Sequence, residues 1–322
     1  MRAIRIHAIG GPDVLQVEDI PVPEPGPGAV RIKLEAIGLN FIDIYRRSGL
    51  YATTFPAILG TEAAGVVEAI GSGVTLFQPG DRVGSTAIPN AYAEYAVAPA
   101  DALVPIPQGI ATPAAAAALL QGMTAHYLTH STFPLRAGQT ALVHAAGGGV
   151  GALLTQIAVR QGARVLATVS NEAKAQIARA SGAHEVIMYT QTDFAAETRR
   201  LTGGAGVDVV YDSVGKTTFE QSLNSLRRRG MLVLYGQSSG AVPPFDPQTL
   251  NAKGSLFLTR PTIAHYIQDR AELLWRATDL FGWIAQGALT VRVDRTFPLA
   301  EAAAAQRYLE SRAALGKVLL IP

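Results

Sequence analysis

The chain of 322 residues contains no cysteine. Without a thiol it forms no disulfide, thiolate nucleophile, iron–sulfur cluster or cysteine-ligated zinc site. Its histidines include His126 and His130, which have the i, i+4 spacing of a helical metal pair. The residue after His126 is tyrosine rather than glutamate, and no third ligand is near in the sequence, so the spacing is weak as a metal motif. We therefore expect no metal site.

Charges and long apolar runs are also scarce. Only 16% of the residues are charged and the net charge is +2, an excess too small to indicate nucleic acid as a partner. The segment MRAIRIHAIGG at Met1 lacks the apolar core of a signal peptide, and no run approaches the length of a membrane span. We expect a cytoplasmic protein with no membrane partner. Because 322 residues exceed the usual size of one core, we also expect two domains.

The consecutive arginines Arg227, Arg228 and Arg229 allow two interpretations. They form a small basic patch, which suggests nucleic acid. Alternatively, they complement the negative C-terminal end of a helix, with Gly230 in the left-handed conformation as its cap. We favour the helix end and do not expect nucleic acid as a primary partner.

The stretch from Thr140 to Ser170 has the order of a βαβ unit. A short apolar run ends at the glycine-rich AAGGGVG, helical spacing follows, and Arg164–Val169 has the pattern of a second strand. A helix that begins after such a turn has unpaired N–H groups and a partial positive charge, which suit a pyrophosphate. The stretch therefore predicts a dinucleotide site.

The glycine fingerprint of this turn has two possible registers. Its three positions are either Ala146, Gly148 and Gly151, or the same pattern shifted by one residue so that it ends at Ala152. Both registers place the ligand at the same turn, and we leave the choice open.

Strands and helices alternate from this turn to about Arg260, which predicts a parallel sheet with right-handed crossovers. The ligand of such a sheet lies at the carboxyl ends of its strands, where this chain has AAGGGVG, Ser170, Tyr189, DSVG and GQSSG. Before Pro107, short strand signals are separated by glycine and proline without crossover helices, which predicts a mostly antiparallel β domain. Thr112–His130 is rich in helix formers and is expected to link the domains.

Seven blocks, in order along the chain, resemble the medium-chain dehydrogenase/reductase superfamily and, within it, the bacterial branch of the zinc-independent NADPH:quinone oxidoreductases. They are GLNFIDIYRRSGLY at Gly38, LGTEAAGVV at Leu59, PGDRV at Pro79, HAAGGGVG at His144, VVYDSVG at Val209, YGQSSG at Tyr235 and LTRP at Leu258. The zinc enzymes of the superfamily have a metal-binding histidine in place of the threonine of LGTEAAG.

The resemblance implies an α/β fold with a Rossmann-type doubly wound parallel sheet and a GroES-like, mostly antiparallel catalytic domain. We expect the GroES-like domain over residues 1–125 and 261–322, with the C-terminal segment completing it, and the dinucleotide-binding domain over residues 126–260.

The implied function is transfer of a hydride from NADPH to a quinone in a cleft between the domains. An alternative is reduction of the carbon–carbon double bond of enones or enals, and a lesser one is a nucleotide-binding structural or RNA-binding protein. A quinone is already a strong hydride acceptor, so the protein's tasks are orientation and exclusion of water.

The resemblance also implies site residues. Asn40, Tyr45, Tyr51 and Thr124 are expected to hold the nicotinamide and the acceptor, whereas Asp43 is expected to be structural. Gln121 is expected near the nicotinamide. The cofactor-binding residues implied by the family are Asn40, Thr124, Tyr127, Gly148, Gly149, Val150, Gly151, Ser170, Lys174, Tyr189, Ser213, Gly236, Gln237, Ser238, Ser239, Thr259, Arg260 and Arg312.

The segment after the second strand favours NADPH over NADH. NAD enzymes usually carry a carboxylate at the end of this strand for the ribose hydroxyls, but this chain has Ser170 there, with Lys174 and Tyr189 as further candidates. Hydroxyls and an ammonium suit a 2′-phosphate. Glu172 is a counterweight if its side chain turns inward, but the exposed first turn of a helix is its expected place.

The last strand of the nucleotide sheet predicts the oligomeric state. Leu256–Arg260 is expected at an exposed edge of the sheet, where pairing with a second copy covers unpaired backbone groups. We therefore expect a homodimer.

Overall fold

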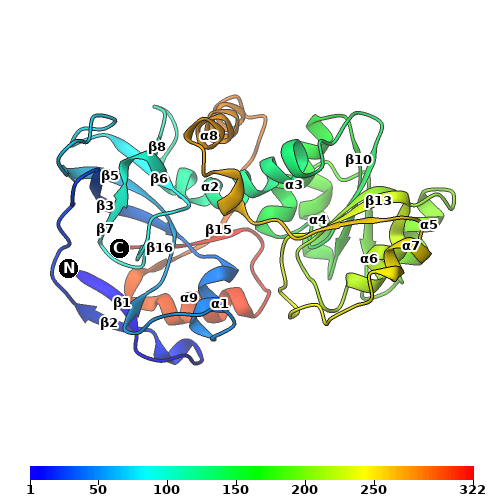
Figure 1. Cartoon of the computed structure of the whole chain (residues 1–322), viewed down its shortest axis with the longest axis horizontal. Coiled ribbons are helices and arrows are strands. Elements are labelled where there is room, and N and C mark those ends of the chain that lie inside the picture. The colour runs from blue at the N-terminus through cyan, green and yellow to red at the C-terminus, as the bar shows by residue number, and fades with distance from the viewer. The chain divides into compact units, whose positions relative to one another are not determined.

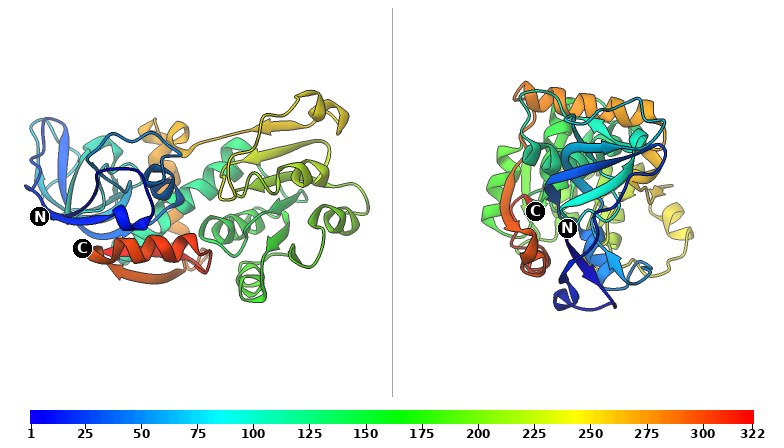
Figure 2. Two further views of the ribbon diagram at one scale, coloured as in Figure 1. Left: turned by 90° about the horizontal axis from the view of Figure 1, so that it is seen from below. Right: turned by 90° about the vertical axis from the view of Figure 1, so that its left-hand side faces the viewer.

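The computed structural model describes all residues from Met1 to Pro322, and the chain folds into two compact units. The first consists of residues 1–120 and 269–322, and the second of residues 121–268. Both chain ends lie in the first unit, at the blue and red ends of the colour scale (Figures 1 and 2). The domain limits expected from the sequence lie near these changes of unit and stay a prediction. None of the helices combines the length and the apolar character that crossing a membrane requires.

The first unit is built mainly from antiparallel strands. A sheet in the order β15-β16-β3-β5-β6-β8, with β7 also paired to β3, lies in the same unit as a smaller sheet in the order β2-β1-β4. Only β15 and β16 pair in parallel. The strands are β1 (Arg2–Ile6), β2 (Gln16–Asp19), β3 (Ala29–Gly38), β4 (Ala57–Ile58), β5 (Glu62–Ile70), β6 (Arg82–Ser85), β7 (Tyr95–Pro99), β8 (Val104–Pro105), β15 (Val293–Pro298) and β16 (Lys317–Ile321).

Helices of the first unit are short, apart from α8. They are α1 (Phe41–Arg47), α8 (Arg270–Ala285) and α9 (Ala302–Glu310), with 3₁₀ turns η1 (Pro12–Val14), η2 (Ala100–Ala102) and η5 (Leu299–Glu301). The tail of the chain supplies α9 and β16, and β16 pairs with β3 of this unit.

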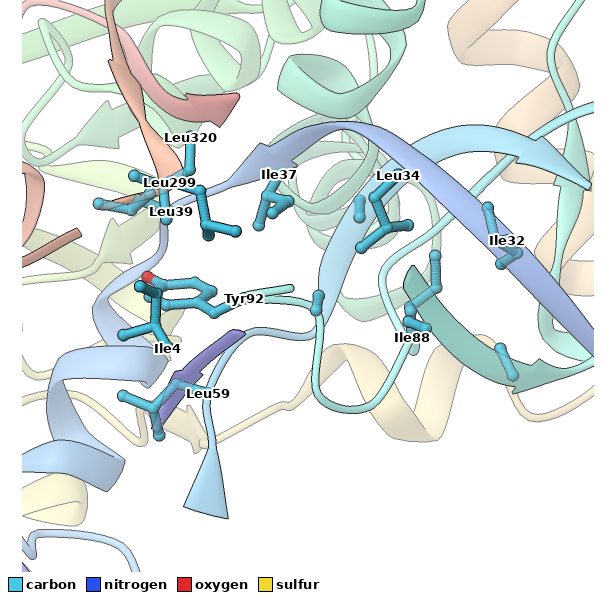
Figure 3. Close-up of a cluster of buried hydrophobic side chains, with 14 of the residues drawn as sticks. Ile4, Ile32, Leu34, Ile37, Leu39, Leu59, Ile88, Tyr92, Leu299 and Leu320 are labelled. Atoms are coloured by element: carbon cyan, nitrogen blue, oxygen red, sulfur yellow. The ribbon is translucent and has the colours of Figure 1, made fainter. Parts of the chain in front are cut away.

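The core of the first unit follows from alternation along β3. Val30, Ile32 and Leu34 are buried, whereas Lys33 is exposed, which is the period of two that a strand with one face on a core requires. The ring of Tyr92 lies between Leu39 and Ile4 in this core (Figure 3). Its hydroxyl therefore needs a buried partner, which Asp43 of α1 supplies.

The second unit is a six-stranded parallel sheet in the order β11-β10-β9-β12-β13-β14. Its strands are β9 (Thr140–Val143), β10 (Arg164–Val169), β11 (Glu185–Met188), β12 (Val207–Asp212), β13 (Leu226–Leu234) and β14 (Phe257–Thr259). Its helices are α3 (Gly149–Arg160), α4 (Glu172–Ala180), α5 (Phe194–Leu201), α6 (Phe219–Ser225) and α7 (Gln248–Ala252), with a 3₁₀ turn η4 (Ile263–Tyr266).

The strand order reverses between β9 and β12, which is the switch point of a doubly wound sheet. Helix α3 packs on α4, and α5 packs on α6. Right-handed crossovers in opposite directions from the switch point put these two pairs on opposite faces of the sheet. The strands are buried on both faces, which explains their continuous apolar runs. The predicted fold class, with its parallel and mostly antiparallel parts, is confirmed.

The helix expected over Thr112–His130 is present as α2 (Thr112–Tyr127), followed by a π-helical turn η3 (Leu128–Thr132). The first and second units meet in the sequence within α2.

The expectation for Arg227–Arg229 is wrong in its geometry. Helix α6 ends at Ser225, and the arginines belong to β13 rather than to a helix end. The residue with a left-handed backbone is Arg229, at φ 58°, and not Gly230. The arginines lie in a register shift between β12 and β13. Arg227 pairs with Asp208 of β12 at 2.7 Å, and the backbone N–H of Arg229 donates to Gly254 O, so these contacts hold the segment instead of a helix cap.

Candidate active site

The glycine turn between β9 and α3 is shaped by close backbone approach. A Cβ on Gly151 would lie 2.3 Å from the carbonyl oxygen of Ala145, and one on Gly149 would lie 2.1 Å from the side-chain oxygen of Gln121. A Cβ on Gly147 would lie 2.6 Å from Cβ of Lys174. Real Cβ atoms do not approach other atoms this closely. At Gly147 and Gly151 the neighbours include backbone atoms, so these two positions admit only glycine, whereas at Gly149 the neighbour is the end of the Gln121 side chain, which can move.

The close approaches do not follow either register of the fingerprint. Gly148 is the N-cap of α3 and has an extended backbone, and its Cβ would meet only Ala145 O, at 3.2 Å. The tight positions are thus every second residue from Gly147 to Gly151. The turn, a glycine cradle, and the first residues of α3 therefore carry almost no side chains of their own, and N–H groups at the start of a helix fit a pyrophosphate.

The other predicted residues of the second unit follow the carboxyl ends of parallel strands, and therefore share one edge of the sheet. They are Ser170 after β10, Tyr189 after β11, Ser213 after β12, Gly236, Gln237, Ser238 and Ser239 after β13, and Thr259 and Arg260 at the end of β14. Their binding roles stay a prediction.

Asp212 holds the turn that carries Ser213. This carboxylate is fully buried at the end of β12 and accepts hydrogen bonds from the backbone N–H groups of Val214, at 2.7 Å, and Gly215, at 3.0 Å. Its second oxygen accepts from the hydroxyls of Thr218, at 2.7 Å, and Ser222, at 2.9 Å. Four bonds to one carboxylate fix the DSVG turn relative to α6.

His144 extends this network to β10. Its ring nitrogens lie 2.7 Å from Oγ1 of Thr168 and 3.0 Å from Oγ of Ser222. Burial lowers the pKa of His144, against the opposing effect of the Asp212 charge, so the ring is neutral and links strands. This network was not predicted from the sequence, although a polar residue at the carboxyl end of each of three neighbouring strands was its signal.

The first turn of α4 settles where Glu172 points. Its carboxylate pairs with Arg179 at 2.5 Å, and both side chains are more than half exposed. The N-cap is Asn171, whose side chain accepts from the backbone N–H of Lys174 at 3.0 Å. Glu172 therefore faces solvent. It does not turn inward, where its carboxylate would have disfavoured the 2′-phosphate of NADPH.

Thr124 and Tyr127 lie on α2 and are both buried. The ring of Tyr127 stacks on that of Tyr266, with centroids 4.3 Å apart. The rings of His126 and His130 also stack, at 4.1 Å, and His130 contacts the carbonyl oxygen of His126. The i, i+4 pair is therefore part of helix packing, and the structure has no group of three or more metal-ligating side chains.

In the first unit, Tyr45 and Tyr51 lie together. Their rings meet edge to face with centroids 5.5 Å apart, and the backbone N–H of Tyr51 donates to Tyr45 O at 3.0 Å. Tyr45 is on α1, whose N-cap is Asn40. Arg312, also in this unit, follows α9 in a left-handed conformation, at φ 60°.

Asp43 is fully buried and structural in its contacts. One carboxylate oxygen accepts from the backbone N–H of Asn40 at 3.0 Å and from the hydroxyl of Tyr92 at 3.1 Å. Burial raises the pKa of Asp43 to about 6, and these hydrogen bonds offset only part of that effect. The carboxylate thereby ties the start of α1 to the core of the first unit.

This burial predicts a pH dependence of stability. Because the folded pKa of Asp43, about 6, lies above its ordinary value of 3.8, the folded state binds the proton more tightly than the unfolded state. Stability contributed by this group therefore rises as pH falls from above 6 toward 4. In urea unfolding at both ends of this window, the free energy of wild type minus that of Asp43→Asn should be larger at the acidic end. His144 titrates oppositely, but it is present in both proteins. A difference that grows with pH would contradict the assignment.

A buried cluster lies beside Asn40. Glu62, at the start of β5, and Lys317, at the start of β16, are both completely buried and pair at 2.5 Å. Both contact the Asn40 side chain. The sequence analysis assigned no role to either residue. Their signal was an ionisable side chain next to an apolar strand, in TEAAGVV and KVLLI.

Two family models match the chain. Residues 26–108 match the alcohol dehydrogenase GroES-like domain, and residues 181–320 match the zinc-binding dehydrogenase domain. The first region covers β3 to β8 of the first unit. The second covers β11 to β14 of the parallel sheet and the C-terminal segment with α8, β15 and α9.

Full-length relatives narrow the family. A quinone oxidoreductase of Pseudomonas aeruginosa is 45% identical over 100% of this chain and 99% of its own length. A 2-haloacrylate reductase of a Burkholderia species is 44% identical over 98% of each chain. The structure of Escherichia coli quinone oxidoreductase complexed with NADPH matches with a TM-score of 0.98 and 43% identity over 100% of both chains. The chain therefore belongs to the quinone oxidoreductase family of the medium-chain dehydrogenases/reductases.

Proposed function

We propose that this protein is a zinc-independent reductase that uses NADPH to reduce quinones. The observation that carries the proposal is the paired rings of Tyr45 and Tyr51, next to Asn40, in a chain whose second unit has a cradle for a pyrophosphate. The activities of the full-length relatives support it.

Bound NADPH supplies the hydride, from C4 of its nicotinamide. The chain's own residues would bind and orient it. The glycine cradle and the N-terminus of α3 would hold the pyrophosphate, and residues after the carboxyl ends of β10 to β13, among them Ser170 and Ser239, would hold the adenosine half. Tyr45 and Tyr51 offer aromatic edges and hydroxyls to a flat acceptor. Oxidation of NADPH by the wild-type protein with quinones tests this function.

Reduction of an activated carbon–carbon double bond is the second candidate. It is favoured by the 2-haloacrylate reductase among the relatives, which acts on such a bond according to its name. The two candidates differ in the acceptor and not in the cofactor, so a comparison of acceptors separates them.

A zinc ion does not fit the donor atoms at the start of β5. Thr61 stands where the zinc enzymes of the superfamily have a histidine, and the chain has no cysteine. Both carboxylate oxygens of Glu62 are engaged, one by the backbone N–H of Leu120 at 2.6 Å and the other by Lys317 and Asn40. The proposed mechanism therefore includes no metal. Its proposed place of action is the cytoplasm.

The preference for NADPH over NADH depends on Lys174. Lys174→Ala is expected to raise the Kd for NADPH roughly 10- to 100-fold and to leave that for NADH nearly unchanged, because a hydrogen bond to a charged group is worth that much. Titration calorimetry with both cofactors measures the effect. Lys253→Ala is the matched control, since Lys253 follows α7 and donates to Asn224, which is two residues before the amino end of β13. An unchanged ratio of the two affinities would remove Lys174 from the phosphate site.

A homodimer formed through β14 is the expected assembly. β14 is the edge strand of the parallel sheet, and Phe257 on it is 56% exposed, which is a liability unless another strand covers it. Phe257→Lys should convert the dimer into a monomer in sedimentation velocity at micromolar concentration. Val17→Lys, on the edge strand β2 of the first unit, should leave the dimer intact. A wild-type protein that sediments as a monomer would refute this assembly.

A further inference from the structure

The amide of Asn40 is held on every side but one. Its Nδ2 donates to the carbonyl oxygen of Gly38 at 3.1 Å and to the carboxylate of Glu62 at 2.7 Å. Its Oδ1 accepts from the ammonium of Lys317 at 2.8 Å. Because Glu62 as a carboxylate only accepts and Lys317 only donates, the amide cannot exchange its oxygen and nitrogen.

Gly38 gives independent support for this arrangement. A Cβ at this position would lie 2.3 Å from Oε2 of Glu62 and 2.8 Å from Cε of Lys317. Position 38 therefore has room for the ion pair only because its residue has no side chain. Burial of Glu62 and Lys317 is complete, so the pair is removed from water as a unit.

A buried ion pair is a poor source of stability, because desolvation of both charges offsets their attraction. Its effect on the orientation of the Asn40 amide is more important here than its effect on stability. Both hydrogens of the Asn40 amide are used within the protein, and an amide oxygen has two lone pairs, of which Lys317 occupies one. Asn40 makes no side-chain cap hydrogen bond at the start of α1 and is 7% exposed, so one acceptor position on Oδ1 is left for a ligand.

We propose that Glu62 and Lys317 are positioning residues that lock the Asn40 amide, so that Asn40 serves a ligand only as a hydrogen-bond acceptor. Asn40 then binds an N–H or O–H group and offers no hydrogen to a quinone carbonyl or an enolate oxygen. The inference rests on the proposed function, in which the donor is the nicotinamide carboxamide or a hydroxyl of the adjacent ribose of NADPH.

A double-mutant cycle on NADPH affinity tests this dependence. The unlocked variant combines Glu62→Gln with Lys317→Met, which removes both charges and lets the amide rotate. We expect it to raise the NADPH Kd roughly 3- to 10-fold, the effect of one hydrogen bond, and Asn40→Ala to do the same or more. The triple variant should bind no more weakly than Asn40→Ala alone. Losses that multiply in the triple variant would overturn the proposal.

Stability separates positioning from a purely structural role. Glu62→Gln alone leaves Lys317 as an unpaired buried cation and should lower the thermal midpoint, whereas the neutral unlocked variant should recover toward wild type. NADPH Kd should remain raised in both. Recovery of Kd together with stability would overturn the proposal. Glu272→Gln is the control, because Glu272 pairs with the buried Arg276 at 3.2 Å on α8 and does not contact Asn40; its Kd should equal that of wild type.

The reduced 3-acetylpyridine analogue of NADPH identifies the donor, because it lacks the carboxamide N–H. If the effect of Asn40→Ala on Kd disappears with the analogue, the carboxamide is the donor; if the effect persists, the ribose hydroxyl is. Wild-type NADPH binding without reduction of any acceptor would refute the proposed function and leave the cycle interpretable. A wild-type protein that reduces quinones but gives an additive cycle would refute only the positioning role.

Discussion

Gly151→Val is expected to abolish NADPH binding and to destabilise the parallel-sheet unit. Its Cβ would lie 2.3 Å from the carbonyl oxygen of Ala145 and 2.8 Å from Cα of Ala146. Both are backbone atoms, so no side-chain movement relieves the contact, and α3 must shift away from the turn. Overpacking of this kind costs about 3 kcal/mol. Misplacement of reacting groups by about 1 Å lowers the reaction rate by about 100-fold, and we expect the displaced α3 to weaken NADPH binding by a factor on that order.

The matched control is Gly282→Ala. Gly282 lies within α8, and a Cβ there meets no atom within 4 Å. Since glycine in a helix interior is less favourable than alanine, this variant should gain about 0.5 to 1 kcal/mol and bind NADPH normally. Urea unfolding and NADPH titration of both variants give the comparison. Wild-type affinity in Gly151→Val would mean that the turn is not the pyrophosphate site.

Asp212→Ala is expected to cost about 3 to 5 kcal/mol of stability, because it removes four hydrogen bonds and leaves buried donors without an acceptor. The backbone N–H groups of Val214 and Gly215 lose their acceptor, as do the hydroxyls of Thr218 and Ser222. Ser213 then loses its fixed position at the rim, so NADPH affinity should fall as well.

Asp193→Ala is the control for a carboxylate with similar partners in an exposed place. Asp193 is the N-cap of α5 and accepts from the backbone N–H groups of Ala195, at 2.8 Å, and Ala196, at 3.0 Å. Loss of such a cap costs about 1 kcal/mol. In urea unfolding, the free energy of unfolding of Asp212→Ala should therefore be well below that of Asp193→Ala. Equal losses would show that the buried network adds nothing beyond local caps.

Much of the fold was predictable because its signals are local. Strand and helix periods, glycine turns and the alternation of elements after Thr140 specify a parallel sheet, and parallel pairing then collects Ser170, Tyr189 and Ser213 at one edge without any knowledge of side-chain packing. The edge position of Phe257 on β14 follows from the same order.

The remaining features depend on contacts between distant parts of the chain. Glu62 and Lys317 are separated by 255 positions, and no local pattern reveals that both reach Asn40. The tight glycine positions depend on Gln121 and Ala145 as neighbours, so the motif allowed two registers and the packing follows neither of them. The Gly230 cap failed because β13 begins earlier than its apolar run and includes the arginines.

The most direct test of the proposed function is the rate of NADPH oxidation by wild-type protein with a panel of quinones, enones, a 2-haloacrylate, aldehydes and simple ketones at matched concentration. Asn40, Tyr45 and Tyr51 supply orientation but no acid–base pair that a simple ketone requires, whereas a quinone gains aromaticity on reduction. The account predicts the fastest oxidation with ortho- or para-quinones, slower oxidation with enones, and negligible rates with simple ketones. An enone or the 2-haloacrylate reduced far faster than every quinone would contradict it.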